Sequence, residues 1–241
     1  MLLVANVGNT HLRLGTFEEG DEPVSTQAVA VESLDTLRAP EASAEALVVG
    51  SVNPEATARL RAWAAAALRC PVLELRVELA VPLRFACNDP SRIGADRVAN
   101  AIALHQRTGR GGIAVDFGTA ISLAVVSPEG EFLGGAIAPG LAMSARALHA
   151  DTALLPLADP AAAAPALSCR TETAIATGLL WGLAGLVDRL VERFGERWPD
   201  VAVLATGGDA ALLVPFCRRV HAIAPHLTLE GLRHAYLQRP R

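Results

Sequence analysis

The sequence contains one local arrangement twice: a short apolar segment, a polar turn with a glycine, and a second apolar segment. In the first half, residues 2–5 run into Asn6-Val7-Gly8-Asn9-Thr10, and in the second half residues 112–115 run into Asp116-Phe117-Gly118-Thr119-Ala120. Asn6 and Asp116 are 110 positions apart. Each copy continues into a further apolar segment, as two strands joined by a tight turn do. The repeat predicts two α/β domains, each opened by a β-hairpin.

The polar residues of these turns indicate a ligand that carries phosphate groups. Asp116 places a carboxylate at the end of a strand, Gly118 lets the backbone approach a ligand, and Thr119 adds a hydroxyl. Two such turns facing one another would form a nucleotide cleft. The alternative is a pair of ordinary hairpins whose glycines serve only the turns.

Composition limits the classes of function. The chain has 241 residues, of which 51% are hydrophobic and 19% charged, so it can bury a core in two domains. Its net charge of −4 provides no basic surface, and we expect no nucleic acid partner. The four cysteines have neither zinc nor disulfide spacing, and they indicate small core residues in a reducing cytosol.

No segment of the sequence is typical of a membrane protein. The chain opens directly on strand-like residues, without the cationic start of a signal sequence. The longest uncharged apolar helix that we expect, residues 174–187, has 14 residues, fewer than the roughly 20 that span a bilayer. We therefore expect a cytoplasmic protein with no membrane association.

The first half predicts three antiparallel strands followed by helices that alternate with parallel strands. Residues 24–31 read as the third strand, and 46–52 as a buried parallel strand that ends at Asn53-Pro54, a typical helix start. A helix over 55–68 and a strand over 72–75 follow. Residues 77–93 contain two prolines and are expected to form an irregular linker, which divides the chain into domains 1–92 and 93–241.

Asp96 and Arg97 precede a helical pattern over residues 98–106. They fall in the first turn of this helix, where exposed N–H groups favour anions. An aspartate at this place also occurs as a simple helix cap. The glycine before it and the arginine beside it favour a functional role.

A long helix is predicted over residues 172–194, with Thr171 as its cap. Gly178, Gly182 and Gly185 lie along one of its faces. Interior glycines cost roughly 1 kcal/mol each relative to alanine, so three of them suggest that another helix packs very close. That helix belongs either to a partner subunit or to the same chain.

Taken together, these segments resemble the type III pantothenate kinases, members of the acetate kinase, sugar kinase, Hsp70 and actin superfamily. The resemblance covers nearly the whole chain, and each motif alone is weak whereas the ordered set is specific. The matching pieces are Val7-Gly8-Asn9-Thr10, Gly94-Ala95-Asp96-Arg97, Asp116-Phe117-Gly118-Thr119-Ala120, Gly134-Gly135 with Pro139-Gly140, Thr171 with Ala174-Ile175 and Gly178, Thr206-Gly207-Gly208, and residues 227–232.

The resemblance implies two duplicated RNase H-like domains of the actin-like ATPase type around a central cleft that binds ATP, and a homodimer that completes the pantothenate site. It implies ATP-dependent phosphorylation of pantothenate, with Asp96 as catalytic base and Asp116 as ligand of a monovalent cation, K⁺ or NH₄⁺. ATP with Mg²⁺ would be bound by Asn6, Val7, Gly8, Asn9, Thr10, His11, Leu12, Arg13 and Thr119. Pantothenate would be bound by Gly94, Ala95, Asp96, Arg97 and Thr171.

One residue departs from the family pattern. The family opens with Asp-x-Gly-Asn-Thr, and this chain has Asn6 in place of the aspartate. An amide keeps an acceptor oxygen but lacks the negative charge, so we expect weaker binding of the magnesium of MgATP. A catalytically impaired homologue that binds pantothenate or nucleotide in a regulatory role is therefore an alternative. A sugar or acetate-type kinase is a third interpretation, and the box at residues 94–97 argues against it.

Overall fold

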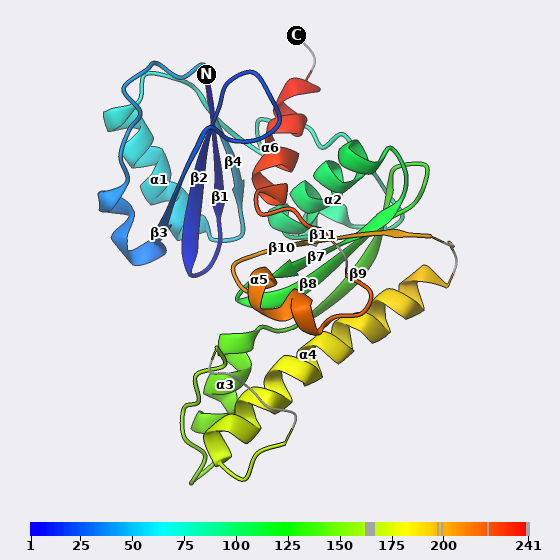
Figure 1. Cartoon of the computed structure of the whole chain (residues 1–241). Coiled ribbons are helices and arrows are strands. Elements are labelled where there is room, and N and C mark those ends of the chain that lie inside the picture. The colour runs from blue at the N-terminus through cyan, green and yellow to red at the C-terminus, as the bar shows by residue number, and fades with distance from the viewer. Residues whose placement is uncertain (162–166, 197, 199, 221, 240–241) are drawn as a thin grey trace. The chain divides into compact units, whose positions relative to one another are not determined.

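A computed structural model of the chain describes residues 1–161, 167–196, 198, 200–220 and 222–239 (Figure 1). The described residues contain a five-stranded sheet and a six-stranded sheet. The strands of the first sheet, in spatial order, are β3 (Ser25–Ala30), β2 (His11–Phe17), β1 (Leu2–Val7), β4 (Leu47–Ser51) and β5 (Val72–Glu74). β1 pairs antiparallel with β2 and parallel with β4, and β5 extends the parallel part. The predicted third antiparallel strand and the buried parallel strand are confirmed.

Helices cover both faces of the first sheet because the side chains of its central strands are apolar on both sides. On β1, Leu3 and Ala5 are in the core beneath α1 (Pro54–Ala67), whereas Leu2 and Val4 are in the core shared with α2 (Ala95–Thr108) and α6 (Leu227–Leu237). Asn53 caps α1 with a hydrogen bond from the Ala56 N–H, as its sequence predicts. A 3-10 helix, Val31–Thr36, precedes β4.

The second sheet repeats the order of the first. Its strands, in spatial order, are β11 (Ala222–Ile223), β10 (Ala202–Thr206), β7 (Gly112–Phe117), β8 (Ala120–Val126), β9 (Glu131–Pro139) and β6 (Arg84–Phe85). β10 is parallel to β7, as β4 is to β1. Read from β11 to β9, the order matches that of the first sheet read from β5 to β3. The shared order supports a duplicated actin-like fold.

Three helices accompany the second sheet. They are α3 (Leu141–Ala150), α4 (Thr171–Gly195) and α5 (Ala210–Leu213), the last of which continues into a 3-10 turn, Val214–Phe216. α3 packs against α4, as Figure 1 shows. The long helix predicted over residues 172–194 is confirmed as α4.

Contacts within the chain group it into two compact units. Unit 1 comprises residues 1–110, 126–133 and 226–241, and unit 2 comprises residues 111–125 and 134–225. α2 and α6 belong to unit 1 because they pack on each other and on the first sheet. This grouping differs from the division between residues 92 and 93, which stays a prediction.

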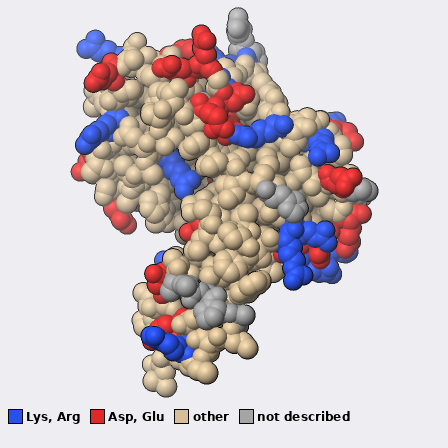
Figure 2. Space-filling view, in the orientation of Figure 1, with Lys and Arg blue, Asp and Glu red and all other residues tan. Residues whose placement is uncertain are grey.

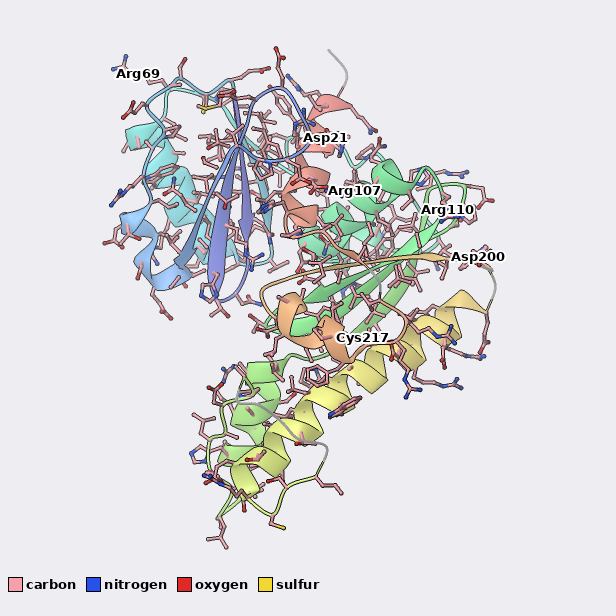
Figure 3. The ribbon with its side chains drawn as sticks, in the orientation of Figure 1. Asp21, Arg69, Arg107, Arg110, Asp200 and Cys217 are labelled. Carbon is pink, nitrogen blue, oxygen red and sulfur yellow. The ribbon has the colours of Figure 1, made fainter. Side chains whose placement is uncertain are left out.

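An ion pair fixes the C-terminal helix to α2 within unit 1. Arg107 Nε and Nη2 donate to the two carboxylate oxygens of Glu230 at 2.6 and 2.8 Å, and Glu230 is only 1% exposed. Arg107 Nη2 also donates to Glu22 at 2.8 Å, and Arg233 Nη1 donates to Asp21 at 2.5 Å. Figure 3 shows Arg107 and Asp21 beside α6. Such bidentate pairs define the position of the helix that carries them.

Two expectations about local structure are wrong. Residues 77–93 are not wholly irregular, since they contain β6 and a short 3-10 helix, Pro90–Arg92. The cysteines are free, but they are not core residues: Cys87 and Cys169 are exposed, and Cys70 and Cys217 are half-buried. A short strand that pairs with a distant part of the chain leaves no periodic pattern to detect.

α4 has 25 residues and among the described helices is the one long and apolar enough to cross a membrane. Length and composition alone are a weak indication, because the core helix of a soluble protein meets the same criterion. Ideal Cβ atoms on Gly178, Gly182 and Gly185 would have no described atom within 4 Å beyond the helix's own backbone. The glycines therefore do not accommodate a neighbouring helix of the same unit, and the alternative of a partner subunit stays open.

Candidate active site

The first polar turn lies between β1 and β2 in unit 1. The Gly8 N–H donates to the His11 carbonyl at 3.0 Å and closes the turn. Asn9, Thr10 and His11 are exposed, whereas Val7 and Leu12 are buried. Of the residues expected to bind ATP, Val7 and Leu12 are fully buried in the sheet, whereas Asn9, Thr10 and His11 expose groups that a ligand can reach.

Asn6 is the last but one residue of β1 and is half-buried. Arg13 on β2 lies directly across from it, and Gly50 is its neighbour on β4. Directly opposed residues of an antiparallel pair project to the same face of the sheet. An aspartate at position 6 would thus face the guanidinium group of Arg13, whereas the neutral amide of Asn6 cannot form an ion pair with Arg13.

The box at residues 94–97 begins α2 and adjoins the first turn within unit 1. An ideal Cβ on Gly94 would lie 2.5 Å from Asp96 Oδ1 and 3.3 Å from Val52 Cγ1, so a larger residue there would have to displace the Asp96 carboxylate. The Val52 N–H donates to the Val7 carbonyl at 3.0 Å. The structure therefore brings the box at residues 94–97 and the turn after Val7 to one region of unit 1, through a residue that the sequence analysis missed.

Asp96 is not the cap of α2. Gly94 occupies the N-cap position, and no side chain makes a capping hydrogen bond there. Asp96 Oδ1 accepts a hydrogen bond from the Arg97 N–H at 2.7 Å, and both residues are half-buried. Burial lowers the pKa of the Arg97 guanidinium, which the adjacent Asp96 charge opposes, and an arginine still stays protonated at neutral pH.

Three turns meet around Asp116 in unit 2. Asp116 is the last but one residue of β7 and lies beside Thr206 of β10. An ideal Cβ on Gly207, whose φ is 97°, would lie 2.5 Å from Asp116 Oδ1 and 2.5 Å from the Phe117 carbonyl. The Gly140 N–H donates to the Thr119 carbonyl at 3.1 Å. The carboxylate of Asp116 thus lies among the loops that contain Gly118, Gly140 and Gly207, and the lack of side chains at these glycines lets the loop backbones approach it.

Thr171 lies on another part of unit 2. It is the first residue of α4, but the N-cap is Arg170 and no side-chain cap is formed, so the expected capping role is wrong. Thr171 is exposed and lines a cavity of about 550 Å³ together with Leu148, Leu155, Cys169, Arg170, Ala174, Ile175, Gly178 and Leu179. The cavity combines an apolar wall with the hydroxyl and guanidinium groups of Thr171 and Arg170.

The site residues expected from the sequence thus fall into three sets. Asn6 to Arg13 and the box at residues 94–97 adjoin each other in unit 1, Asp116 and Thr119 share one edge of unit 2, and Thr171 lies at the start of α4. Within the described residues, no three His, Cys, Asp or Glu side chains are grouped to hold a metal ion. Acidic and basic side chains are interspersed over the face shown in Figure 2.

Comparison with known proteins decides the family. The model of the type III pantothenate kinase family matches residues 2–193. This chain is a member of the type III pantothenate kinase family. The type III pantothenate kinase of Rubrobacter xylanophilus is 33% identical over 258 residues, an alignment that covers 98% of this chain and 97% of that protein. That of Salinispora arenicola is 35% identical over 249 residues and covers 98% of each.

The segment that the family model matches, residues 2–193, contains every site residue predicted from the sequence, from Asn6 to Thr171. Solved structures show the same fold at lower identity. A Baf family protein from Campylobacter jejuni has a TM-score of 0.67 at 17% identity, with 98% of each chain covered. A ROK family glucokinase from Streptomyces griseus has a TM-score of 0.55 at 15% identity, also with 98% of each covered. These similarities confirm the actin-like ATPase fold.

Proposed function

We propose that this protein transfers the γ-phosphoryl group of ATP to the 4′-hydroxyl of pantothenate, the first step of coenzyme A biosynthesis. Membership of the type III pantothenate kinase family along nearly the full chain carries this proposal. The retention of Gly94-Ala95-Asp96-Arg97 at the start of α2, beside the turn after Val7, supports it.

In the proposed reaction, the 4′-oxygen of pantothenate attacks the γ-phosphorus of ATP, the bond to the β,γ-bridging oxygen breaks, and ADP leaves. Asp96 accepts the hydroxyl proton as the new P–O bond forms. The carboxylate of Asp96 is half-buried, and its Oδ1 accepts a hydrogen bond from the Arg97 N–H, which leaves the other lone pairs of the carboxylate for the substrate hydroxyl. Arg97 binds the carboxylate of pantothenate as a charge-assisted pair.

We assign the phosphates of ATP to the turn between β1 and β2 and to Thr119. Asn9 and Thr10 offer N–H and hydroxyl groups there, beside Gly8, whose own N–H closes the turn, and ATP carries Mg²⁺ on its phosphates. Asp116 fits a monovalent cation, K⁺ or NH₄⁺, because its carboxylate is a hard oxygen ligand and the glycine at position 207 adds no side chain against it. Such a cation would neutralise negative charge on the phosphates.

A homodimer is part of the proposal. Added Cβ atoms on Gly178, Gly182 and Gly185, which form the glycine face of α4, would meet no described atom within 4 Å beyond the helix itself. Trp181 on the same helix is 49% exposed although it stacks edge-on against Phe216 at 5.2 Å. A second copy of the chain would cover this face near Thr171. A cytoplasmic location follows from the metabolic role, and no nucleic acid or membrane partner is proposed.

Asn6 favours one rival, an impaired homologue that binds pantothenate or nucleotide without efficient transfer. An amide at position 6 supplies no charge toward the magnesium of MgATP. The rival predicts binding of both ligands with little or no turnover, so equilibrium binding and product formation separate the two functions.

Asp96→Asn tests the assignment of the base. The amide keeps the size of the side chain and loses the proton acceptor, so kcat should fall by about 10² to 10⁴ while calorimetric binding of pantothenate persists. The exposed Asp35→Asn is a matched control and should leave kcat unchanged. Unchanged turnover in Asp96→Asn would remove Asp96 from the mechanism.

A further inference from the structure

Four side chains of unit 1 form a continuous stack that ends at the box at residues 94–97. The Arg76 guanidinium carbon lies 5.9 Å from the centre of the Phe85 ring, and the ring centres of Phe85 and Phe132 are 5.7 Å apart. The guanidinium carbon of Arg97 lies 5.6 Å from the centre of the Phe132 ring. All three separations lie within the usual range of cation–π and aromatic contacts.

We propose that Phe132, backed by Phe85 and Arg76, positions the guanidinium of Arg97 to bind the carboxylate of pantothenate, an inference that rests on the proposed function. Stacking on a ring fixes the plane of a guanidinium group while its N–H edge stays available for a carboxylate. The three supporting residues are positioning residues, since they act on the substrate through Arg97.

The ring of Phe132 is held rigidly. It is 1% exposed, and its strand β9 pairs in parallel with β6 in a register that sets Phe132 beside Phe85. The Ala86 N–H donates to the Phe132 carbonyl at 3.0 Å. β6 consists of two residues, and its pairing with β9 sets the rings of Phe85 and Phe132 next to each other.

Arg76 holds the other end of the stack and also the backbone before Gly94. Its Nη1 donates to the carbonyl of Ile93, the residue that precedes the box, and to the Ser91 carbonyl at 3.4 Å. Arg76 has a φ of 73°, a conformation uncommon outside glycine. One side chain therefore supports both the start of the box and the ring system beneath Arg97.

A fluorination series tests the stack directly. Replacing Phe132 by phenylalanines with increasing numbers of ring fluorines keeps the shape of the ring and weakens its negative face. The KM for pantothenate should rise stepwise, by about 3- to 30-fold at full fluorination, while the KM for MgATP stays constant. The same ranking should appear in the calorimetric Kd for pantothenate, which remains measurable if turnover is slow.

Phe17 provides the matched control. The guanidinium carbon of Arg233 lies 5.7 Å from its ring centre, Phe17 is fully buried, and Arg233 is ion-paired with Asp21. Fluorination of Phe17 should leave the KM and Kd for pantothenate unchanged. An equal response at positions 17 and 132 would show a general effect on stability and overturn the inference.

A substrate analogue separates this inference from the proposed function. An analogue in which an alcohol replaces the carboxylate should bind equally to the wild type and to the fluorinated Phe132 variants, because it presents no charge to Arg97. Wild-type turnover of pantothenate with a Kd that ignores fluorination of Phe132 would overturn the stack alone. Failure of the wild type to bind pantothenate would overturn both.

Discussion

Restoring the carboxylate at position 6 is the perturbation that best separates an efficient kinase from an impaired one. Asn6→Asp changes one terminal atom of a half-buried side chain on β1, so packing is preserved. The new carboxylate faces Arg13 across the hairpin, and an opposed pair of this kind contributes only about 0.2 to 1 kcal/mol. We therefore expect little change in the free energy of unfolding.

The expected change in rate is much larger. If the charge at position 6 stabilises the magnesium of MgATP in the transition state by about 3 kcal/mol, kcat at limiting Mg²⁺ should rise roughly 100-fold in Asn6→Asp. At saturating Mg²⁺ the difference should shrink, because mass action offsets a weaker site. The assay is initial velocity over a Mg²⁺ titration with ATP, pantothenate and K⁺ held constant.

Gln106→Glu controls for charge alone. Gln106 lies on the exposed side of α2, and the same exchange of amide for carboxylate there should alter neither kcat nor the Mg²⁺ requirement. A wild-type protein that is already fast, with an Asn6→Asp variant no faster at limiting Mg²⁺, would refute the reasoning that position 6 controls the metal.

Three further outcomes are expected. Replacing Na⁺ by K⁺ at constant ionic strength should raise kcat, and Asp116→Ala should abolish the difference; a wild type indifferent to the cation would contradict the assignment. Arg107→Met should lower the free energy of unfolding by about 2 to 3 kcal/mol in denaturant titrations, because it leaves the buried Glu230 unpaired. The expected loss is smaller than for a fully buried ion pair because Arg107 is 36% exposed. Burial lowers the pKa of His234 in the folded chain, so the unfolded chain takes up a proton at higher pH, and the free energy of unfolding should fall as the pH drops below about 6.5. His234→Gln should remove the contribution of this histidine to the pH dependence of stability. The same pH profile in wild type and variant would contradict the assignment.

The duplicated fold could be predicted because its signal is local and repeated. Each copy places a polar turn between two apolar strands, and the structure confirms both, as β1 with β2 and β7 with β8. The position of Asp96 in the first turn of α2 also follows from sequence, since the helical pattern starts directly after it.

Long-range features could not be predicted in the same way. β6 has only two residues, and it is a strand because it pairs with β9. In this pairing Phe85 lies beside Phe132, which is 47 positions later in the sequence. The role of Val52 beside Gly94 likewise depends on the packing of β4 against α2. Cys87 and Cys169 are exposed because they lie in loops, where residue type alone does not determine burial.

The most direct test of the central claim is the identity of the product. Wild-type protein with MgATP, K⁺ and pantothenate should give one ADP for each phosphate ester formed, with the ester located on the 4′-oxygen by ³¹P and ¹H NMR, and Asp96→Asn should slow its appearance by about 10² to 10⁴. ADP formation without this ester, or binding of pantothenate with no ester even in Asn6→Asp, would contradict the proposal that this chain is a pantothenate kinase.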